Sequence, residues 1–182
     1  MNVAFDFGIS NTDIAVQREN KITFFSMPTK AHDVSLTLIQ EILATYSLSQ
    51  HEVKLIGVTG GKSSDLPNHL DSIPVIKINE VDAIGIGAKV LYNIKEEATL
   101  VMSTGTGTAC VLVKGNSINH LGGIAIGGGM LEGLGSLLFQ NSSGQEINEF
   151  ATQGSRKKLD ILIGDAVNSI GTLSPDITAV NF

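Results

Sequence analysis

The sequence predicts a mixed α/β protein built from two similar halves that face each other across a cleft, the second half being incomplete. Three observations lead to this fold class. Both halves open with the same order of strand, glycine turn, strand, polar turn and strand. Segments with helical periodicity follow these strands. The 182 residues are 42% hydrophobic and 16% charged, a composition typical of a chain that forms a core.

The first half, residues 1–97, is expected to form one small α/β domain. Short apolar runs rich in strand formers and bounded by glycine or polar turns predict five strands, at 2–7, 12–17, 22–25, 53–58 and 74–78. Apolar residues at helical spacing predict a helix over 32–46, with Asp33 near its start. A second helix is expected from Glu80 or Val81 to residue 93, despite two internal glycines.

The second half, residues 98–182, repeats the opening pattern and then changes. Strands are expected at 100–102, 108–113 and 117–121, and the strand signals end after Leu121. Helices are expected at 130–140, at 147–153 and from 155 or 156 to 170, and a further element begins at Asp176. Three strands would leave a sheet with an apolar face and an unpaired edge. We therefore expect the chain to be a fragment of a longer protein, or a partner chain to cover this face.

Composition and charge exclude several classes of function. The net charge is −6 and the pI is near 5.1, and no basic cluster exceeds residues 156–158, so no nucleic-acid partner is expected. Cys110 is the single cysteine, which excludes an internal disulfide and fits a reducing cytosol. The N-terminus lacks the basic segment of a signal peptide, and no apolar run is long enough to span a membrane. We expect a cytoplasmic protein with no membrane partner.

Hydroxyl and glycine residues gather in the turn that opens each half. Backbone N–H groups in such turns bind phosphate oxygens, and two turns that face each other can hold a phosphate chain between them. This arrangement resembles that of the actin, sugar-kinase and Hsp70 superfamily. The alternative for the second turn is a plain hairpin connection. The residues predicted to bind phosphate are Gly8, Ser10, Asn11, Thr12, Gly105, Thr106, Gly107 and Thr108.

Seven glycines lie between Leu121 and Leu138 among aliphatic residues. Each glycine loses more backbone entropy on folding than another residue would, so this density requires a reason. One interpretation is a phosphate cradle at a helix N-terminus, with Gly127, Gly128 and Gly129 nearest the ligand. The other is close packing of a helix where no side chain fits, which we expect for Gly133 and Gly135.

Two acidic positions could take part in chemistry. Asp6 lies at the end of a strand and could hold Mg²⁺ through water, although a turn-forming role is the alternative. Glu80 follows a strand and begins a helix, where a carboxylate could accept the proton of an attacking hydroxyl. Glu80 and Asp82 could equally be acids that stabilise a helix N-terminus. The four histidines show no metal-ligand spacing, so no zinc site is expected.

Five motifs together resemble the type II pantothenate kinases over nearly the whole length. These motifs are FDFG around Asp6, TGG at 59–61, NEVDA at 79–83, GTGT at 105–108 and the glycine stretch at 121–138. The ending DITAVNF resembles the segment that precedes the final part of the family's sequences. The resemblance implies an actin-like fold and phosphorylation of the primary hydroxyl of pantothenate by ATP, with Mg²⁺, in the first step of coenzyme A synthesis. It also implies a homodimer and feedback by CoA or acyl-CoA.

The resemblance also implies roles for single residues. Glu80 corresponds to the family's catalytic base, and Asp6 with the turn at 8–12 to its first phosphate element. Thr106, Gly128, Gly129 and Met130 correspond to residues that contact ATP. His120, Gly122 and Gly123 are predicted to bind the acceptor substrate.

Three departures from the family pattern concern charge and turn structure. Ile9 and Ser10 stand where a glycine and a threonine are usual, Asp13 replaces a lysine, and His120 replaces an arginine. Loss of cations near a transferring phosphoryl group weakens its stabilisation. His120 could still act as a cation, and Asp13 could instead face solvent on its strand. A regulatory homologue that binds a nucleotide or acyl-CoA without turnover is therefore an alternative to a kinase.

A third interpretation is another actin-like ATPase, such as a sugar kinase or an activator of a dehydratase. Such an activator uses a cysteine that binds a cluster at its interface. Cys110 lies inside a predicted strand, which argues against this role.

Overall fold

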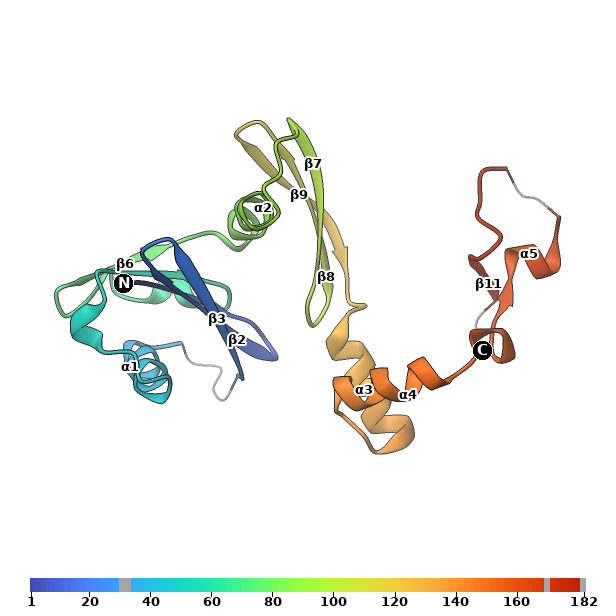
Figure 1. The fold of residues 1–182 in the computed structure, drawn as a ribbon, viewed down its shortest axis with the longest axis horizontal. Coiled ribbons are helices and arrows are strands. Elements are labelled where there is room, and N and C mark those ends of the chain that lie inside the picture. The colour runs from blue at the N-terminus through green and yellow to red at the C-terminus, as the bar shows by residue number, and fades with distance from the viewer. Residues whose placement is uncertain (30–33, 169–170, 181–182) are drawn as a thin grey trace. The chain divides into compact units, whose positions relative to one another are not determined.

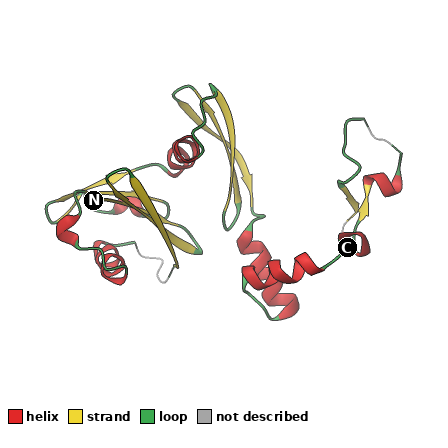
Figure 2. Ribbon diagram, in the orientation of Figure 1, coloured by secondary structure: helices red, strands yellow, loops and turns green. Residues whose placement is uncertain are grey.

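The computed structural model describes residues 1–29, 34–168 and 171–180, in two compact units, Met1–Gly129 and Met130–Phe182. The first unit holds two sheets, and the second is formed by short helices and a two-stranded ribbon (Figures 1 and 2). No helix is long and apolar enough to cross a membrane in the part of the chain that the structure describes. The domain boundary predicted after residue 97 stays a prediction.

The N-terminal sheet has six strands in the order β3-β2-β1-β4-β6-β5. All five strands predicted in the first half are confirmed, with ends that shift by up to three residues. β5 is additional, because two residues are too few for a sequence signal. The strands are β1 (Asn2–Phe7), β2 (Asn11–Arg18), β3 (Lys21–Pro28), β4 (Leu55–Thr59), β5 (His69–Leu70) and β6 (Ile73–Lys77). β1, β4 and β6 are parallel, so their carboxyl ends meet at one edge.

The core of the first unit lies on one face of this sheet. Alternate residues of β1 and β2 point to it, and α1 (Leu36–Thr45) contributes Ile39, Ile42 and Leu43. Ser35 caps α1, since its Oγ accepts a hydrogen bond from Leu38 N–H at 3.2 Å. The predicted start at residue 32 and the role of Asp33 lie outside the described residues. A short helical turn, η1 (Gln50–Glu52), precedes β4, and another, η2 (Ser63–Asp65), follows it.

The second sheet is an antiparallel meander of β7 (Ala98–Thr104), β8 (Thr108–Lys114) and β9 (Ser117–Ile124). Helix α2 (Glu80–Leu91) packs against it through Gly85, where a Cβ would lie 2.9 Å from methyl carbons of Val113 and Ile118. The expectation that strand structure ends at Leu121 is wrong, because β9 continues past a bulge. Leu121 is left out of the register there, and Gly122 adopts a φ of +146°.

The second unit contains α3 (Gly128–Phe139), which begins at the end of the first unit, and α4 (Gly144–Gln153). Both correspond to predicted helices. The predicted helix from 155 to 170 is wrong: this segment forms η3 (Arg156–Lys158), β10 (Ile161–Leu162) and α5 (Ile163–Ala166). β10 pairs with β11 (Thr178–Val180), the element that begins after Asp176, so a tertiary pairing replaces the local helical pattern. Residues 169–170 are outside the described part.

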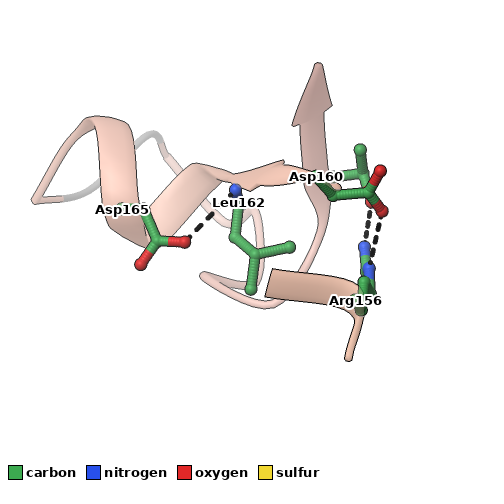
Figure 3. A network of polar contacts seen from close by, with 5 residues as sticks. Arg156, Asp160, Leu162 and Asp165 are labelled. Atoms are coloured by element: carbon green, nitrogen blue, oxygen red, sulfur yellow. Dashed lines mark hydrogen bonds and ion pairs between the residues drawn. The ribbon is translucent and has the colours of Figure 1, made fainter. Parts of the chain in front are cut away.

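Side-chain hydrogen bonds fix this ribbon (Figure 3). Arg156 Nε donates to Asp160 Oδ2 at 3.1 Å, and Thr178 Oγ1 donates to the same oxygen at 3.1 Å. Leu162 N–H donates to Asp165 Oδ2 at 3.4 Å. The acid at residue 160 thereby joins η3 to β11, which a continuous helix would not allow.

Candidate functional site

The two glycine turns predicted to bind phosphate meet within the first unit. Ser10 lies in the turn between β1 and β2, and Thr106 in the turn between β7 and β8. Their hydroxyl oxygens are 2.8 Å apart, although 96 residues separate them in the chain. The structure therefore brings together two turns that the sequence related only by their similar pattern.

The first turn is braced by hydrogen bonds from Thr29. Thr29 N–H donates to Ser10 O and Thr29 Oγ1 donates to Gly8 O, both at 2.9 Å. Thr12 is buried, and its hydroxyl lies 3.2 Å from Thr29 Oγ1. At Gly8 a Cβ would lie 2.6 Å from Asn11 O, so the tight turn requires glycine. These bonds hold the turn so that the Ser10 hydroxyl reaches the second turn.

The second turn packs against the start of α3, backbone on backbone. Gly128 N–H donates to Gly105 O at 2.8 Å, and Thr108 Oγ1 donates to Ile126 O at 2.7 Å. At Gly127 a Cβ would lie 2.7 Å from the carbonyl oxygens of Gly105 and Thr106. Close approach to the turn thus explains Gly127, whichever ligand the turn binds.

These bonds also limit which amides are free. Gly105 N–H donates to Gly107 O at 2.8 Å, and Gly128 N–H is used as described above. Both amides were predicted phosphate donors, and both already have acceptors inside the protein. At Gly129 a Cβ would lie 3.2 Å from Thr106 O. Met130 is the first residue of the second unit.

A cluster of carboxylates lies at the edge of the N-terminal sheet. Asp6 in β1 is directly opposite Asp13 in β2. The protein around the Asp6 carboxyl removes part of its hydration and raises its pKa above the usual value of 3.8, and the negative charges of Glu80 and Asp13 raise this pKa further. Asp13 lies on the same face of the sheet as Asp6, the face opposite the core, and it is exposed to solvent there as the alternative for its strand expected.

The surroundings of Asp6 fit a hydrated cation better than direct coordination. Within the described residues, no group of three or more side chains is arranged as metal ligands. Thr59 is paired with Asp6 in register, and its buried Oγ1 has no hydrogen-bond partner. A carboxylate crowded by like charges and a hydroxyl without a partner fit a Mg²⁺ ion that keeps its own water.

Glu80 is the first residue of α2, at the carboxyl edge of the parallel strands. Asn79 caps the helix, with Val81 N–H donating to its Oδ1 at 2.9 Å. Glu80 lines an open hollow of about 400 Å³ at this edge. The remaining lining residues of the hollow are Gly60, Gly61, Ser63, Ser64, Lys77, Ile78 and Asn79. Ligands of open α/β sheets bind at such an edge.

The TGG motif forms one wall of the hollow. Gly60 and Gly61 have φ values of +71° and +46°, which favour glycine. At Gly60 a Cβ would lie 2.5 Å from Asp6 Oδ1 and 2.8 Å from Phe7 O. Glycine here lets the end of β4 approach the Asp6 carboxylate closely. Sequence reasoning missed Lys77 and Ser63, because a lysine that ends a strand and a serine beyond the TGG motif belong to no recognised motif.

His120 lies on the face of the second sheet that α2 covers. It pairs with the buried Val111 and is two residues from Ile118, which contacts α2 at Gly85. Gly122 and Gly123 follow the bulge in the same strand. At Gly123 a Cβ would lie 2.7 Å from Thr108 O, so close strand packing accounts for this glycine.

Comparison with known proteins finds similarity to kinases of one family. A family model described as Fumble matches residues 94–180. The chain is 31% identical over 190 residues to a type II pantothenate kinase of Bacillus cereus strain AH820, covering 99% of this chain and 64% of that protein. It is 29% identical over 188 residues to the Staphylococcus aureus strain USA300 enzyme, covering 100% of this chain and 66% of that protein. The chain thus spans about two thirds of the length of these relatives.

Solved structures show the same fold at low sequence identity. Component A of the (R)-2-hydroxyglutaryl-CoA dehydratase of Acidaminococcus fermentans aligns with a TM-score of 0.60 and 13% identity, over 89% of this chain and 61% of that one. A ROK family glucokinase of Streptomyces griseus, in complex with glucose and AMPPNP, aligns with a TM-score of 0.51 and 16% identity, over 68% and 48%. The expected actin-like α/β fold class is confirmed.

Proposed function

We propose that this chain, a homologue of the type II pantothenate kinases, phosphorylates the primary hydroxyl of pantothenate or a close relative such as pantetheine, with ATP as donor. The reaction would be the first step of coenzyme A synthesis. The contact between Ser10 and Thr106 is the observation that carries this proposal. It joins the two phosphate-binding turns in one place.

Glu80 is the general base in this proposal. Its carboxylate accepts the proton of the acceptor hydroxyl as that oxygen attacks the γ-phosphorus of ATP. The new oxygen–phosphorus bond forms while the bond between the γ-phosphorus and the bridging oxygen breaks, and ADP leaves with that electron pair. The Glu80 side chain is exposed in an open hollow, which gives an acceptor direct access to it.

The two turns supply hydrogen-bond donors for ATP. The hydroxyls of Ser10 and Thr106 meet where a phosphate would lie, and the unoccupied amides of the second turn add donors. Gly127, Gly128 and Gly129 hold that turn against the start of α3. In this proposal the Gly128 amide does not bind phosphate itself. It supports the second turn by donating to Gly105 O.

Asp6 would hold Mg²⁺ through water, with the orphaned hydroxyl of Thr59 nearby. When bound, the cation supplies positive charge to the phosphate oxygens. The protein's own contribution is a carboxylate kept close to two others, whose repulsion a cation would relieve.

The acceptor would lie in the hollow beside Glu80. His120, Gly122 and Gly123 of β9 are proposed to contact it on the resemblance to the family alone, since none of them lines that hollow. We further propose a cytoplasmic homodimer with CoA or acyl-CoA as feedback ligand, and functional domains at 1–97 and 98–182. These proposals rest on the resemblance to the family.

The direct test is phosphoryl transfer by the purified protein. With ATP and Mg²⁺, we expect ADP release that depends on pantothenate or pantetheine, and a product heavier by one phosphate in mass spectrometry. ATP alone is the control for hydrolysis. If neither acceptor is phosphorylated while ATP binds, the kinase proposal fails.

A regulatory homologue is the second candidate, and Asp13 favours it. An acid directly opposite Asp6 adds negative charge where the family usually has a lysine. Calorimetry would then show binding of ATP or CoA by a protein without turnover, and Glu80→Gln would change neither affinity.

A further inference from the structure

Lys77 is the single cation among the residues that line the hollow beside Glu80. It is the last residue of β6, at the same strand edge, and Glu80 follows three residues later. Within the lining, Glu80 is the single acid. The hollow therefore has one positive and one negative side chain, separated by residues 78 and 79.

None of the residues that the structure describes pairs with the Lys77 ammonium group. In the described ranges, the ion pairs are Arg18 with Glu52 and Arg156 with Asp160, and no side-chain hydrogen bond involves Lys77. The side chain is exposed at the hollow. A free ammonium at a ligand-binding edge favours an anionic group of the ligand.

The rest of the lining can support such a group. Ser63 and Ser64 bring hydroxyls, and Ser63 is 5% exposed. Gly60 and Gly61, both with positive φ, form a tight turn next to them. Such turns present amide groups to anions.

We propose that Lys77 binds the carboxylate of an acidic acceptor and so selects it over neutral relatives. This inference rests on the proposed function. Three residues of extended chain span at most about 10 Å. Pantothenate has its primary hydroxyl and its carboxylate at opposite ends, so the hydroxyl would face Glu80 while the carboxylate meets Lys77. In pantetheine this carboxyl group is joined to cysteamine as a neutral amide, and the extension ends in a thiol.

A nucleotide phosphate is the other possible source of the anion. The turns that meet at Ser10 and Thr106 do not line this hollow. In the proposed function the phosphates of ATP bind at those two turns. The carboxylate of the acceptor is therefore the anion left for Lys77. Separate measurements for donor and acceptor distinguish the two sources.

The test measures the steady-state kinetics of the wild-type protein and of Lys77→Ala. Pantothenate, pantetheine and ATP are each titrated in turn. We expect the KM for pantothenate to rise about tenfold, the typical loss of one charge-assisted hydrogen bond at an exposed site. The KM for pantetheine and the KM for ATP should stay within about twofold, and kcat should be retained. Lys77→Arg should recover most of the pantothenate affinity, because it keeps the charge.

Lys62→Ala is the matched control. Lys62 lies between Gly61 and Ser63 in the same loop but does not line the hollow, so its loss should leave all three KM values unchanged. Equal KM changes for pantothenate and pantetheine would overturn the inference, and a rise confined to ATP would assign Lys77 to the nucleotide. A wild-type protein that phosphorylates neither acceptor would refute the proposed function itself, and the inference with it.

Discussion

At Asp6, a single carboxyl group shows how the fold concentrates negative charge before any ligand binds. The strand register sets Asp13 opposite it, and α2 brings Glu80 near it. Loss of hydration is the larger cause of its raised pKa, and the two charges add to it. The folded state therefore holds an ionised Asp6 less favourably than the unfolded chain does.

This raised pKa predicts a stability change with a defined sign. Above the raised pKa, Asp6 is ionised in both states and the folded state is destabilised by that charge. Asp6→Asn should therefore raise the melting temperature near neutral pH. As the pH falls through the raised pKa, the folded state binds a proton before the unfolded state does. The gain in melting temperature from Asp6→Asn should therefore shrink as the pH approaches the usual pKa of 3.8. Thermal denaturation at a series of pH values measures this.

Asp176→Asn is the control for the loss of one charge, since Asp176 is exposed in the second unit. Its effect should be small and should not follow the same pH dependence. A melting temperature for Asp6→Asn that is unchanged or lowered near neutral pH would contradict the account of this cluster.

Single residues also show what sequence patterns left open. Alternation along β2 places Asp13 on the face opposite Thr12 and Ile14, and the structure agrees. Alternation could not show which residue of the next strand lies beside Asp13, and the pairing register makes that residue Asp6. Lys77 was missed because a lysine at the end of a strand has no motif, and its position beside Glu80 depends on how β4 and β6 pair.

Among the elements, α3 illustrates why glycine density alone is ambiguous. At Gly135 a Cβ would lie 2.5 Å from Asn141 O and would also collide with Ile147 of α4. At Gly133, two residues earlier, a Cβ would meet nothing within 4 Å. Packing therefore explains Gly135 but does not explain Gly133, although both were predicted to serve it.

The pair gives a matched test within one helix. Gly135→Ala should destabilise the α3–α4 pair by about 1–3 kcal/mol, the usual effect of forcing a methyl group into a filled site. Gly133→Ala should instead stabilise α3 by about 0.5–1 kcal/mol, because alanine loses less backbone entropy in a helix. Hydrogen exchange of the α3 and α4 amides measures both. Equal effects of the two substitutions would contradict this packing.

Elements with strong local signals were predicted well, and those defined by tertiary contacts were not. β1, β4 and α2 have clear periodicity and clear ends. The segment 155–170 has helical spacing of its apolar residues, yet Ile161 and Leu162 pair with β11, and Asp160 accepts a hydrogen bond from Thr178 of that strand. Such long-range pairing cannot be read from local periodicity.

For the whole molecule, the repeated order of strands and glycine turns was enough to predict the fold class. The order indicated that two turns would face one cleft, and the Ser10–Thr106 contact brings them together. The distance between the turns depends on tertiary packing, and one amide of the second turn is used within the turn itself. The hollow beside Glu80 forms where the loop after β4 meets the end of β6 and the start of α2, so no single segment encodes it.

The central claim is that Glu80 is the base of a kinase site that these two turns complete. Glu80→Gln keeps the shape of the side chain and removes its basicity. We expect kcat for acceptor phosphorylation to fall by about 10²- to 10⁴-fold, with the Kd for ATP unchanged by calorimetry, while Asp82→Asn in the same helical turn retains activity. A Glu80→Gln protein that turns over at the wild-type rate would contradict the account.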